Sequence, residues 1–430
     1  MSRNPLGTFL TPAAAADGSS PVDAILDAVR EHLGMEIAFA SRFTDGRREF
    51  TNIRSSFPVP AVPGDSELLE DSFCHRILAG RLPQLIHDAQ DYDAALEMDL
   101  TGALPVGAHL NVPLRLADGS VYGTFCCLSR DPDYSLTNRD LNTLKAFADL
   151  AAGHIERDLI ANHRQSIVRQ RIEAVLAEDR IGIVFQPIHR LADGTVVGVE
   201  ALSRFSDLGG EWPLPSDWFA AAADAGLGLE LELLAIESAL LALPYLPSNL
   251  YLSVNASPQT VASGALEPLL RTLPANRIVI ELTEHSLISE FAGLEEAVAR
   301  LRGLARIAID DVGAGYSGLR RIVDLKPDLL KLDMGLTRQV DCDESRSALA
   351  QALVGFSRRT GSKMIAEGVE TLAEAELLRA IGVGYGQGYL FSRPMPAVAL
   401  LQFLLGATRG PPSMSPVRPS EVPTAKLASA

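Results

Sequence analysis

The sequence predicts an α/β protein in which a TIM-type (β/α)8 barrel follows a smaller α+β domain. Roughly eight apolar strand candidates alternate with amphipathic helices over residues 175–407, as in a parallel barrel. A shorter block at residues 21–160 has paired strands between two helices instead. Polar residues stand near the ends of most barrel strands, which gives the second block a candidate site.

The first block is predicted to be an independent α+β domain. A helical pattern of apolar residues opens it, and strand candidates follow at 36–43, 48–55, 107–116 and 120–129. Asp118-Gly119 joins the last two strands and is a strong signal for a β-hairpin. A helix from about Asn138 then leads out of the domain.

The helical pattern from Thr137 to about Ala177 connects the two blocks. Its apolar residues recur at spacings of three and four as far as Leu159, and residues 161–174 are expected to form a helical linker. The pattern suits a connector helix packed on its own domain and, equally, a helix that pairs with a second copy of the chain. We expect a homodimer.

Composition restricts the class of partner. The net charge is −16, so a nucleic acid polymer is not expected to bind, because no excess of cations can replace its counterions. The most apolar helix candidate, residues 229–246, contains several Glu and a Pro, so no membrane span is predicted. Four cysteines without a disulfide or zinc spacing indicate a cytoplasmic protein. Residues 1–20 and 408–430 are predicted to be disordered.

The second block supplies the chemistry. Its strand candidates run at 181–188, 195–202, 250–256, 277–283, 305–311, 329–333, 363–369 and 386–391. The polar residues near their ends are Glu200, Asn255, Glu281, Asp310, Asp311, Lys331, Asp333, Glu367, Glu370 and Gln387, the last at the start of its strand. In a parallel barrel the carboxyl ends of the strands share one rim, so these residues should converge there.

This group of residues predicts a site for divalent cations. Carboxylate and amide oxygens without Cys or His suit Mg²⁺ or Mn²⁺ rather than structural zinc. Because Asp310 and Asp311 are adjacent, one of them can bridge two ions, an arrangement that serves phosphodiester cleavage. Any single carboxylate here could instead be a helix cap or a surface charge, but so many on one rim would repel each other without cations between them.

The motifs of the second block resemble those of the EAL domain family. Glu200-Ala201-Leu202 is the signature that names the family. The other motifs are FQPI (185–188), SVNAS (253–257), ELTE (281–284), DDVGAGYSGL (310–319), KPDLLKLD (326–333), AEGVE (366–370) and QGYLFSRPMP (387–396). The resemblance covers the entire block and implies a modified TIM barrel that hydrolyses cyclic di-GMP to linear 5′-pGpG by in-line attack of a water activated by two metal ions.

The resemblance also implies a role for each matching residue. Metal ligands would be Glu200, Asn255, Glu281, Asp310 and Asp311, and Lys331 and Glu367 would join Glu200 as catalytic residues. Contacts to the substrate would come from Gln186, Leu202, Arg204, Asp333, Glu370 and Gln387, and Glu284 would tether the 310–319 loop. Departures from the family pattern occur at Ser203, Phe205, Val312 and Gly384. They leave the metal ligands intact but bear on affinity and regulation.

The sequence leaves two alternative functions open. A catalytically silent cyclic di-GMP receptor would keep the fold but typically lose some of the metal ligands, all of which are present here. An unrelated barrel metalloenzyme such as an enolase-like lyase would explain the oxygen ligands but not the ordered motifs.

The first block, with PVGAHLNVPLRLADGSVYGTF (105–125), resembles a GAF sensory domain, which implies that it regulates the barrel. Its ligand is not revealed by the sequence. Cys74-His75 invites comparison with a bilin attachment site, but its position in an early helix favours a packing role. His87, Asp88, Asp91 and Asp93 could suggest a metal, although a solvated loop explains them better.

Overall fold

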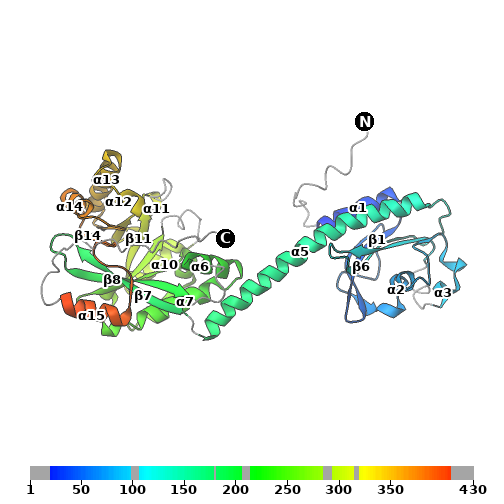
Figure 1. Cartoon of the computed structure of the whole chain (residues 1–430), viewed down its shortest axis with the longest axis horizontal. Coiled ribbons are helices and arrows are strands. Elements are labelled where there is room, and N and C mark those ends of the chain that lie inside the picture. Colours follow the sequence, from blue (N-terminus) through cyan, green and yellow to red (C-terminus); the bar gives the residue numbers. More distant parts are fainter. Residues whose placement is uncertain are drawn as a thin grey trace, which may run out of the picture. The chain divides into compact units, whose positions relative to one another are not determined.

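The computed structural model describes residues 20–97, 106–178, 181–205, 214–283, 293–313 and 319–407. The chain divides into two compact units, Met1–Gln165 and Ser166–Ala430 (Figure 1). The predicted disordered segments lie outside the described residues except for Ser20, which caps the first helix. The domain boundaries at 160 and 174 stay predictions.

The first unit is built on one antiparallel sheet. Its strands are β1 (Ile37–Thr44), β2 (Arg47–Ser55), β3 (Ser66–Leu68), β4 (Leu85–Ile86), β5 (His109–Arg115) and β6 (Val121–Leu128), in the order β3-β2-β1-β6-β5-β4. The predicted hairpin joins β5 to β6, where the Asp118 carboxylate accepts a hydrogen bond of 2.8 Å from the Ser120 amide. Gly119 has φ of 84°, a conformation that favours glycine at this turn.

Helices and short turns complete the first unit. They are α1 (Pro21–His32), α2 (Phe73–Leu78), α3 (Asp93–Leu96) and the beginning of α5 (Asn138–Glu178). Ser20 and Asp23 form a capping box that fixes where α1 begins. Adjacent residues of β6 point to opposite faces of the sheet, so Cys127 joins the core beneath α1 and α5 while Cys126 joins a separate core that includes Cys74 of α2.

The second unit is a closed barrel. Its strands are β7 (Ile181–Arg190), β8 (Val196–Phe205), β9 (Tyr251–Asn255), β10 (Ile278–Thr283), β11 (Arg306–Val312), β12 (Leu329–Leu332), β13 (Lys363–Ala366) and β14 (Tyr385–Gly386). They pair in chain order, and β14 also pairs with β7 and thereby closes the ring. This topology is consistent with the predicted modified TIM barrel.

One strand departs from the regular alternation that the sequence pattern suggested. β7 runs antiparallel to β8, to β14 and to the two-residue strand β15 (Met395–Pro396), whereas β8 to β14 pair in parallel. No helix fits between β7 and β8, because only five residues separate them and Gly194, with φ of 72°, closes a tight turn there. Residues near the middle of β7 can therefore face the same rim as the ends of the parallel strands.

The last predicted strand is also shorter than expected. β14 ends at Gly386, so Gln387 follows the strand and does not begin it. The chain turns away because Gly388 adopts φ of 155° and lies against the backbone of Val369. This change places Gln387 at the carboxyl end of β14, level with the polar residues of the other strands.

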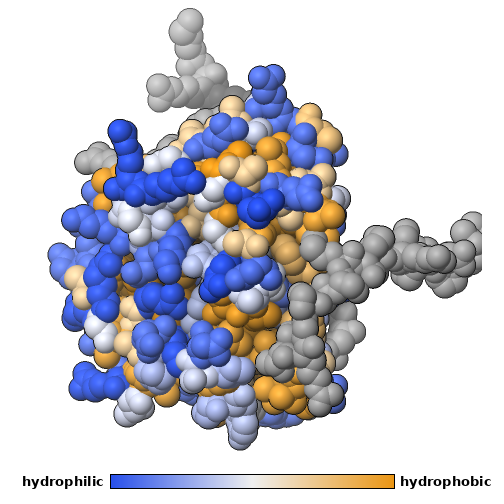
Figure 2. Space-filling view, turned by 90° about the vertical axis from the view of Figure 1, so that its left-hand side faces the viewer, coloured by the Kyte–Doolittle hydropathy of each residue, from blue (hydrophilic) through white to orange (hydrophobic). Residues whose placement is uncertain are grey.

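Helices surround the barrel strands. They are α6 (Pro215–Asp224), α7 (Gly228–Leu240), α8 (Pro258–Ser263), α9 (Leu266–Leu270), α10 (Leu294–Leu301), α11 (Leu319–Leu325), α12 (Met334–Thr337), α13 (Glu344–Thr360), α14 (Leu372–Ile381) and α15 (Ala397–Ala407). Figure 2 shows one face of this unit, on which hydrophobic and hydrophilic residues are interspersed. Within the described ranges, no helix has both the length and the apolar character needed to span a bilayer.

Candidate active site

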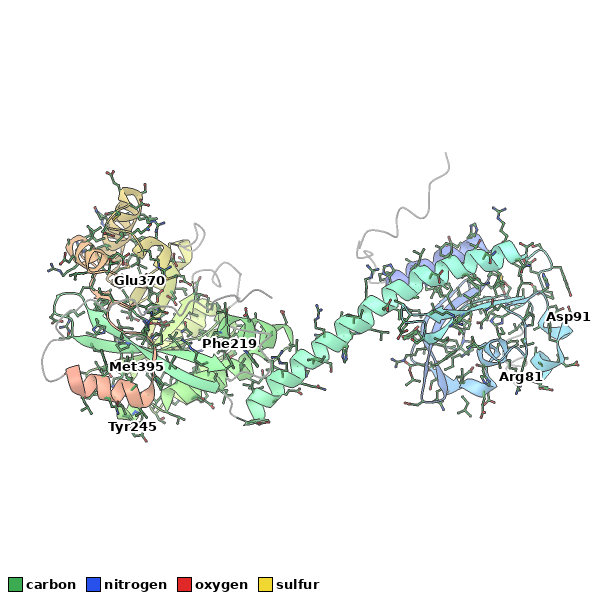
Figure 3. All side chains as sticks on the ribbon, viewed as in Figure 1. Arg81, Asp91, Phe219, Tyr245, Glu370 and Met395 are labelled. Carbon is green, nitrogen blue, oxygen red and sulfur yellow. The ribbon has the colours of Figure 1, made fainter. Side chains whose placement is uncertain are left out.

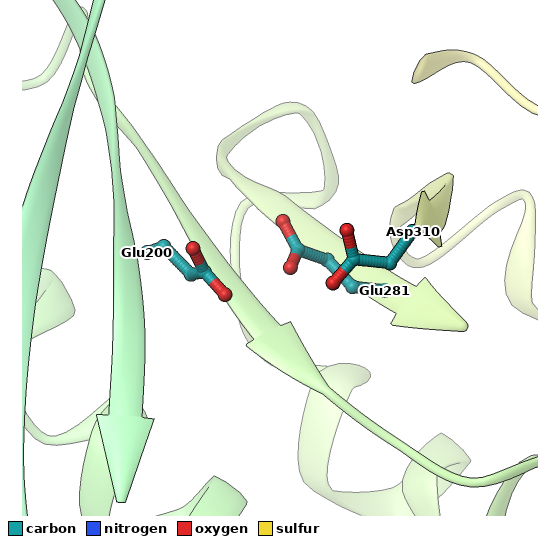
Figure 4. A group of neighbouring side chains, drawn as sticks. All are labelled: Glu200, Glu281 and Asp310. Carbon is teal, nitrogen blue, oxygen red and sulfur yellow. The ribbon is translucent and has the colours of Figure 1, made fainter. Parts of the chain in front are cut away.

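Three buried carboxylates meet inside the rim of the barrel. Glu200 lies on β8, Glu281 on β10 and Asp310 on β11 (Figure 4). Each offers one carboxylate oxygen, and these oxygens lie within 4.8 Å of one another. Parallel pairing through β9 brings the three strands into register, so their ends deliver the side chains to one place.

A second group of carboxylates shares Asp310 with the first. Asp310, Asp311 and Glu367 also offer oxygens within 4.8 Å of one another. Consecutive residues of a regular strand point to opposite faces, but Asp311 has φ of 56° and the register with β12 shifts between Ile309 and Val312. The irregular backbone thus lets two adjacent aspartates serve one site.

Lys331 lies among these carboxylates and is fully buried, with 0% of its side chain exposed. Its Nζ atom is 2.7 Å from Glu367 and 2.8 Å from Glu281. Two longer contacts of 3.2 and 3.4 Å reach Asp310 and Glu200. One ammonium therefore faces four carboxylates, and the cluster keeps an excess of negative charge.

Burial and charge shift the pKa values of this cluster strongly. Burial raises the pKa of Glu281 to about 8, with Glu200 and Asp310 adding to the effect and Lys331 opposing it. Burial also raises the pKa of Glu367 well above its usual value. Burial tends to lower the pKa of Lys331, but the surrounding carboxylates hold it well above the ordinary range. The ammonium is therefore permanently charged, whereas the carboxylates compete for too little positive charge.

The side chains of two glutamines and one asparagine hold Glu200 in place. Gln387 donates a hydrogen bond of 2.5 Å to Glu200, and Asn255, at the end of β9, donates one of 3.2 Å. Gln387 also donates to Gln186 of β7, which in turn donates to the carbonyl of Ser392. The antiparallel strand β7 thus contributes to the site through Gln186, which pairs in register with Glu200.

Ser253 is a member of the site that the sequence reasoning did not single out. Its buried hydroxyl donates a short hydrogen bond to Oε1 of Glu281, opposite the oxygen that Lys331 contacts. The signal was present in the sequence, because Ser253 lies two residues before Asn255 on the same strand and therefore on the same face.

Several predicted substrate residues have other partners in the structure. Asp333 caps α12 by accepting a hydrogen bond of 2.8 Å from the Gly335 amide. Glu370, labelled in Figure 3, pairs with Arg338 at 2.6 Å. Arg204 is exposed and donates to the carbonyl of Ser203, and Leu202 is half-buried beside it on β8. Glu284 lies outside the described residues.

Two of the four departures from the family pattern, Phe205 and Val312, pack against apolar neighbours. Phe205 stacks on Trp218 with ring centroids 4.8 Å apart and meets Phe219, labelled in Figure 3, edge-on at 5.6 Å. Val312 is fully buried in the barrel core. The ring of Phe205 therefore fills an aromatic cluster beneath α6.

The cluster fits divalent cations by its own chemistry. It gathers hard oxygen donors with excess negative charge, and Asp310 belongs to both groups of ligands. Burial makes unpaired carboxylates costly, so cations among them would relieve their repulsion. The cluster is thus compatible with divalent metal binding.

Comparison with known proteins identifies the family of each domain. The EAL domain model matches residues 169–394, and the GAF domain model matches residues 19–155. The chain is 32% identical over 247 residues to the Probable cyclic di-GMP phosphodiesterase PdeB of Escherichia coli, across 54% of this chain and 46% of that protein. It is 30% identical over 283 residues to the Cyclic di-GMP phosphodiesterase NbdA of Pseudomonas aeruginosa, across 61% of this chain and 35% of that protein.

The solved structure titled "PaMucR Phosphodiesterase, c-di-GMP complex" is 28% identical, with a TM-score of 0.50, and covers 54% of this chain and 99% of that one. The chain spans about half the length, or less, of the curated relatives named above. The EAL model alone covers more than half of the sequence. The chain therefore belongs to the EAL domain family, and a GAF domain precedes its EAL domain.

Proposed function

We propose that the chain hydrolyses cyclic di-GMP to linear 5′-pGpG at the rim of the barrel. The observation that carries the proposal is the pair of oxygen clusters that share Asp310, with Lys331 buried among them. The relatives named as cyclic di-GMP phosphodiesterases, and the matched structure in complex with this dinucleotide, support the choice of substrate.

Glu200, Asn255, Glu281, Asp310 and Asp311 are proposed to hold two Mg²⁺ or Mn²⁺ ions. When bound, such ions would neutralise charge on the phosphodiester and make a water molecule more nucleophilic. Shared use of Asp310 supports two ions rather than one, because its carboxylate belongs to both ligand groups.

Lys331 and Glu367 are proposed to act on the attacking water. Their side chains are 2.7 Å apart, so a water placed beside them can donate a proton to Glu367 while Lys331 orients it. Hydrogen bonds from Gln387 and Asn255 keep Glu200 oriented toward the same place. In this proposal Glu200 binds metal, Lys331 orients the attacking water, and Glu367 accepts its proton.

Contacts to the dinucleotide are proposed for Gln186, Leu202, Arg204, Asp333, Glu370 and Gln387. Arg204 is exposed on β8, four residues after Glu200, and its planar guanidinium suits a phosphate. The same proposal has three further parts. Glu284 tethers the 310–319 loop, the GAF domain regulates the barrel, and the chain forms a homodimer.

The test is to incubate the full chain with cyclic di-GMP and Mg²⁺ or Mn²⁺ and to measure pGpG. Product that depends on the divalent ion is expected. Binding of the dinucleotide without product would overturn the proposal in favour of a receptor.

A matched pair of variants sharpens the test. Glu200→Gln should abolish product formation, because it keeps the shape of the side chain but removes a charged ligand and one of the two oxygens that accept from Gln387 and Asn255. Glu376→Gln changes an exposed glutamate of α14 in the same way and should turn over cyclic di-GMP as the native chain does. Equal turnover in both variants would remove Glu200 from the metal site.

A further inference from the structure

Three hydrogen-bond donors converge on the sulfur of Cys74 in the GAF domain. Cys74 lies on α2 and is fully buried. The Thr124 hydroxyl donates to its Sγ atom at 3.0 Å, the Arg48 guanidinium at 3.1 Å and the Asn111 amide at 3.3 Å. A neutral thiol is a weak acceptor, so this set of donors suits a thiolate.

The charges around Cys74 agree with a thiolate. Arg48 is buried on β2 and forms an ion pair of 2.7 Å with Glu67 of β3, while its guanidinium also reaches the sulfur. Burial tends to raise the pKa of Cys74, but hydrogen bonds from Cys126 and Thr124 and the charge of Arg48 lower it to about 5. At neutral pH this sulfur is therefore ionised, whereas an ordinary cysteine is mostly a neutral thiol.

The other titratable groups near the sulfur leave this charge balance in place. Burial lowers the pKa of His109, on β5, to about 3, so this histidine adds no positive charge. Burial raises the pKa of Glu67, and Asp71 adds a smaller effect in the same direction. Arg48 is thus the cation that faces Cys74 among the described residues.

A second sulfur lies within reach of the first. Sγ of Cys126, on β6, is 3.8 Å from Sγ of Cys74, although the two residues are 52 positions apart in the chain. Burial raises the pKa of Cys126 well above its usual value, so this thiol keeps its proton. The pair therefore combines one ionised sulfur with one protonated sulfur, as a nucleophilic and a resolving cysteine would.

We propose that Cys74 and Cys126 are a redox modification site, which a hydroperoxide such as hydrogen peroxide oxidises to an intrachain disulfide. The structure points to this pair because the sulfurs are in contact and Cys74 alone receives the converging donors. This inference is independent of the proposed activity of the barrel.

The reaction balances in two steps. The Cys74 thiolate attacks one peroxide oxygen, the O–O bond breaks, and the released hydroxide takes a proton from solvent, which leaves Cys74 as a sulfenic acid and one water. The sulfur of Cys126 then attacks the sulfur of Cys74, and the departing hydroxide takes the proton of Cys126 to form a second water. Two thiols lose two electrons and the peroxide gains them.

Closing the disulfide requires only a local movement. The sulfurs must approach by about 1.7 Å, from 3.8 Å to the S–S bond length. Cys74 lies on α2, a helix of six residues, while Cys126 is held in the centre of the sheet between β1 and β5. We expect α2 to shift toward the sheet, and this short helix also has to open to admit the peroxide.

The test is to treat the full chain with hydrogen peroxide, block free thiols under denaturing conditions and identify the products by mass spectrometry. A disulfide between the tryptic peptides of residues 55–76 and 116–130 is expected. Cys74 should react at least about tenfold faster than Cys342, which is exposed but lies beside Asp341, whose carboxylate raises the pKa of that thiol.

Variants separate the pair from its neighbours. Cys126→Ser should prevent the disulfide and let dimedone trap the sulfenic acid on Cys74, whereas Cys127→Ser, on the opposite face of β6, should leave the disulfide unchanged. Glu67→Gln should shift the pH dependence of Cys74 oxidation to lower pH, because Arg48 then has less competing negative charge and stabilises the thiolate more strongly.

The proposal would be overturned by a native chain in which Cys342 is oxidised while Cys74 remains a free thiol. It would equally be overturned by a disulfide that persists in Cys126→Ser and disappears in Cys127→Ser. A Glu67→Gln chain in which the oxidation of Cys74 depends on pH as it does in the native chain would remove Arg48 from the explanation.

Discussion

Nζ of Lys331 lies 2.7 Å from Oε1 of Glu367, and both atoms are inside a cluster of carboxylates from four different strands or strand ends. The ammonium is the shared counterion of this cluster. Its burial is tolerable because every direction in which it could donate a hydrogen bond meets a carboxylate. This arrangement makes Lys331 a residue whose loss should affect stability as well as turnover.

Replacing Lys331 by Met should destabilise the barrel by about 3–5 kcal/mol in the absence of divalent ions, since it leaves several carboxylates without their counterion. Calorimetry of the full chain with a chelator and with Mg²⁺ would measure the effect. The loss should be smaller with Mg²⁺, because the ion replaces part of the missing charge. An equal loss under both conditions would show that no cation binds among these carboxylates.

Ser253→Ala tests whether the hydroxyl that contacts Glu281 positions this carboxylate. We expect roughly 10–100-fold weaker activation by Mg²⁺, as for other residues that orient a metal ligand, with turnover recovering at high Mg²⁺. The measurement is the Mg²⁺ dependence of pGpG formation. Ser238→Ala is a control, because its hydroxyl donates to the carbonyl of Leu234 on α7. The same Mg²⁺ midpoint in both variants would contradict the prediction.

The sequence was sufficient to predict the elements that carry the carboxylates. Glu281 and Asp310 follow apolar runs that become β10 and β11, and parallel pairing brings them together as expected. The direction of β7 was not predictable from periodicity, because an apolar run has the same pattern in either direction. Ser253 was missed because a buried hydroxyl carries no charge that marks it in the sequence.

The hydrogen-bond partners of Cys74 could not be predicted from the sequence. The sequence favours a packing role for Cys74, and the side chain is fully buried. Its hydrogen-bond partners, however, come from β2, β5 and β6, which only the folded sheet brings to α2. Contacts between residues far apart in the chain depend on register, and a short motif cannot specify them.

Acidification should destabilise the GAF domain through His109. The histidine is fully buried, and burial lowers its pKa from the ordinary value of 6.5 to about 3, so between these pH values the unfolded state binds a proton that the folded state does not. Stability from this group is therefore complete above the unfolded pKa and is lost as pH falls, by up to about 1.4 kcal/mol per pH unit between 6.5 and 3.

Calorimetry of the full chain at a series of pH values measures this loss. His109→Phe removes the titrating group but keeps a ring against Phe73, so its GAF transition should fall less steeply with pH than that of the native chain. His32→Phe replaces an exposed histidine at the end of α1 and should leave the slope unchanged. Parallel slopes for the native and His109→Phe chains would exclude His109 as the cause.

Gly388→Ala should displace Gln387 and thereby disturb Glu200. A Cβ atom at position 388 would lie 2.2 Å from the carbonyl oxygen of Val369, and φ of 155° is already unfavourable for alanine. The atoms that this Cβ meets belong to the backbone of Val369, so the 387–388 segment must move and the hydrogen bond from Gln387 to Glu200 must lengthen or break. We expect a loss of about 2 kcal/mol or more in stability and at least about tenfold slower turnover.

Gly384→Ala is the matched control, because a Cβ atom there would lie 3.9 Å from the carbonyl oxygen of Met364, an ordinary contact. Thermal unfolding and pGpG formation distinguish the two variants, and comparable losses in both would mean that the close approach of Gly388 to Val369 does not hold Gln387 in place.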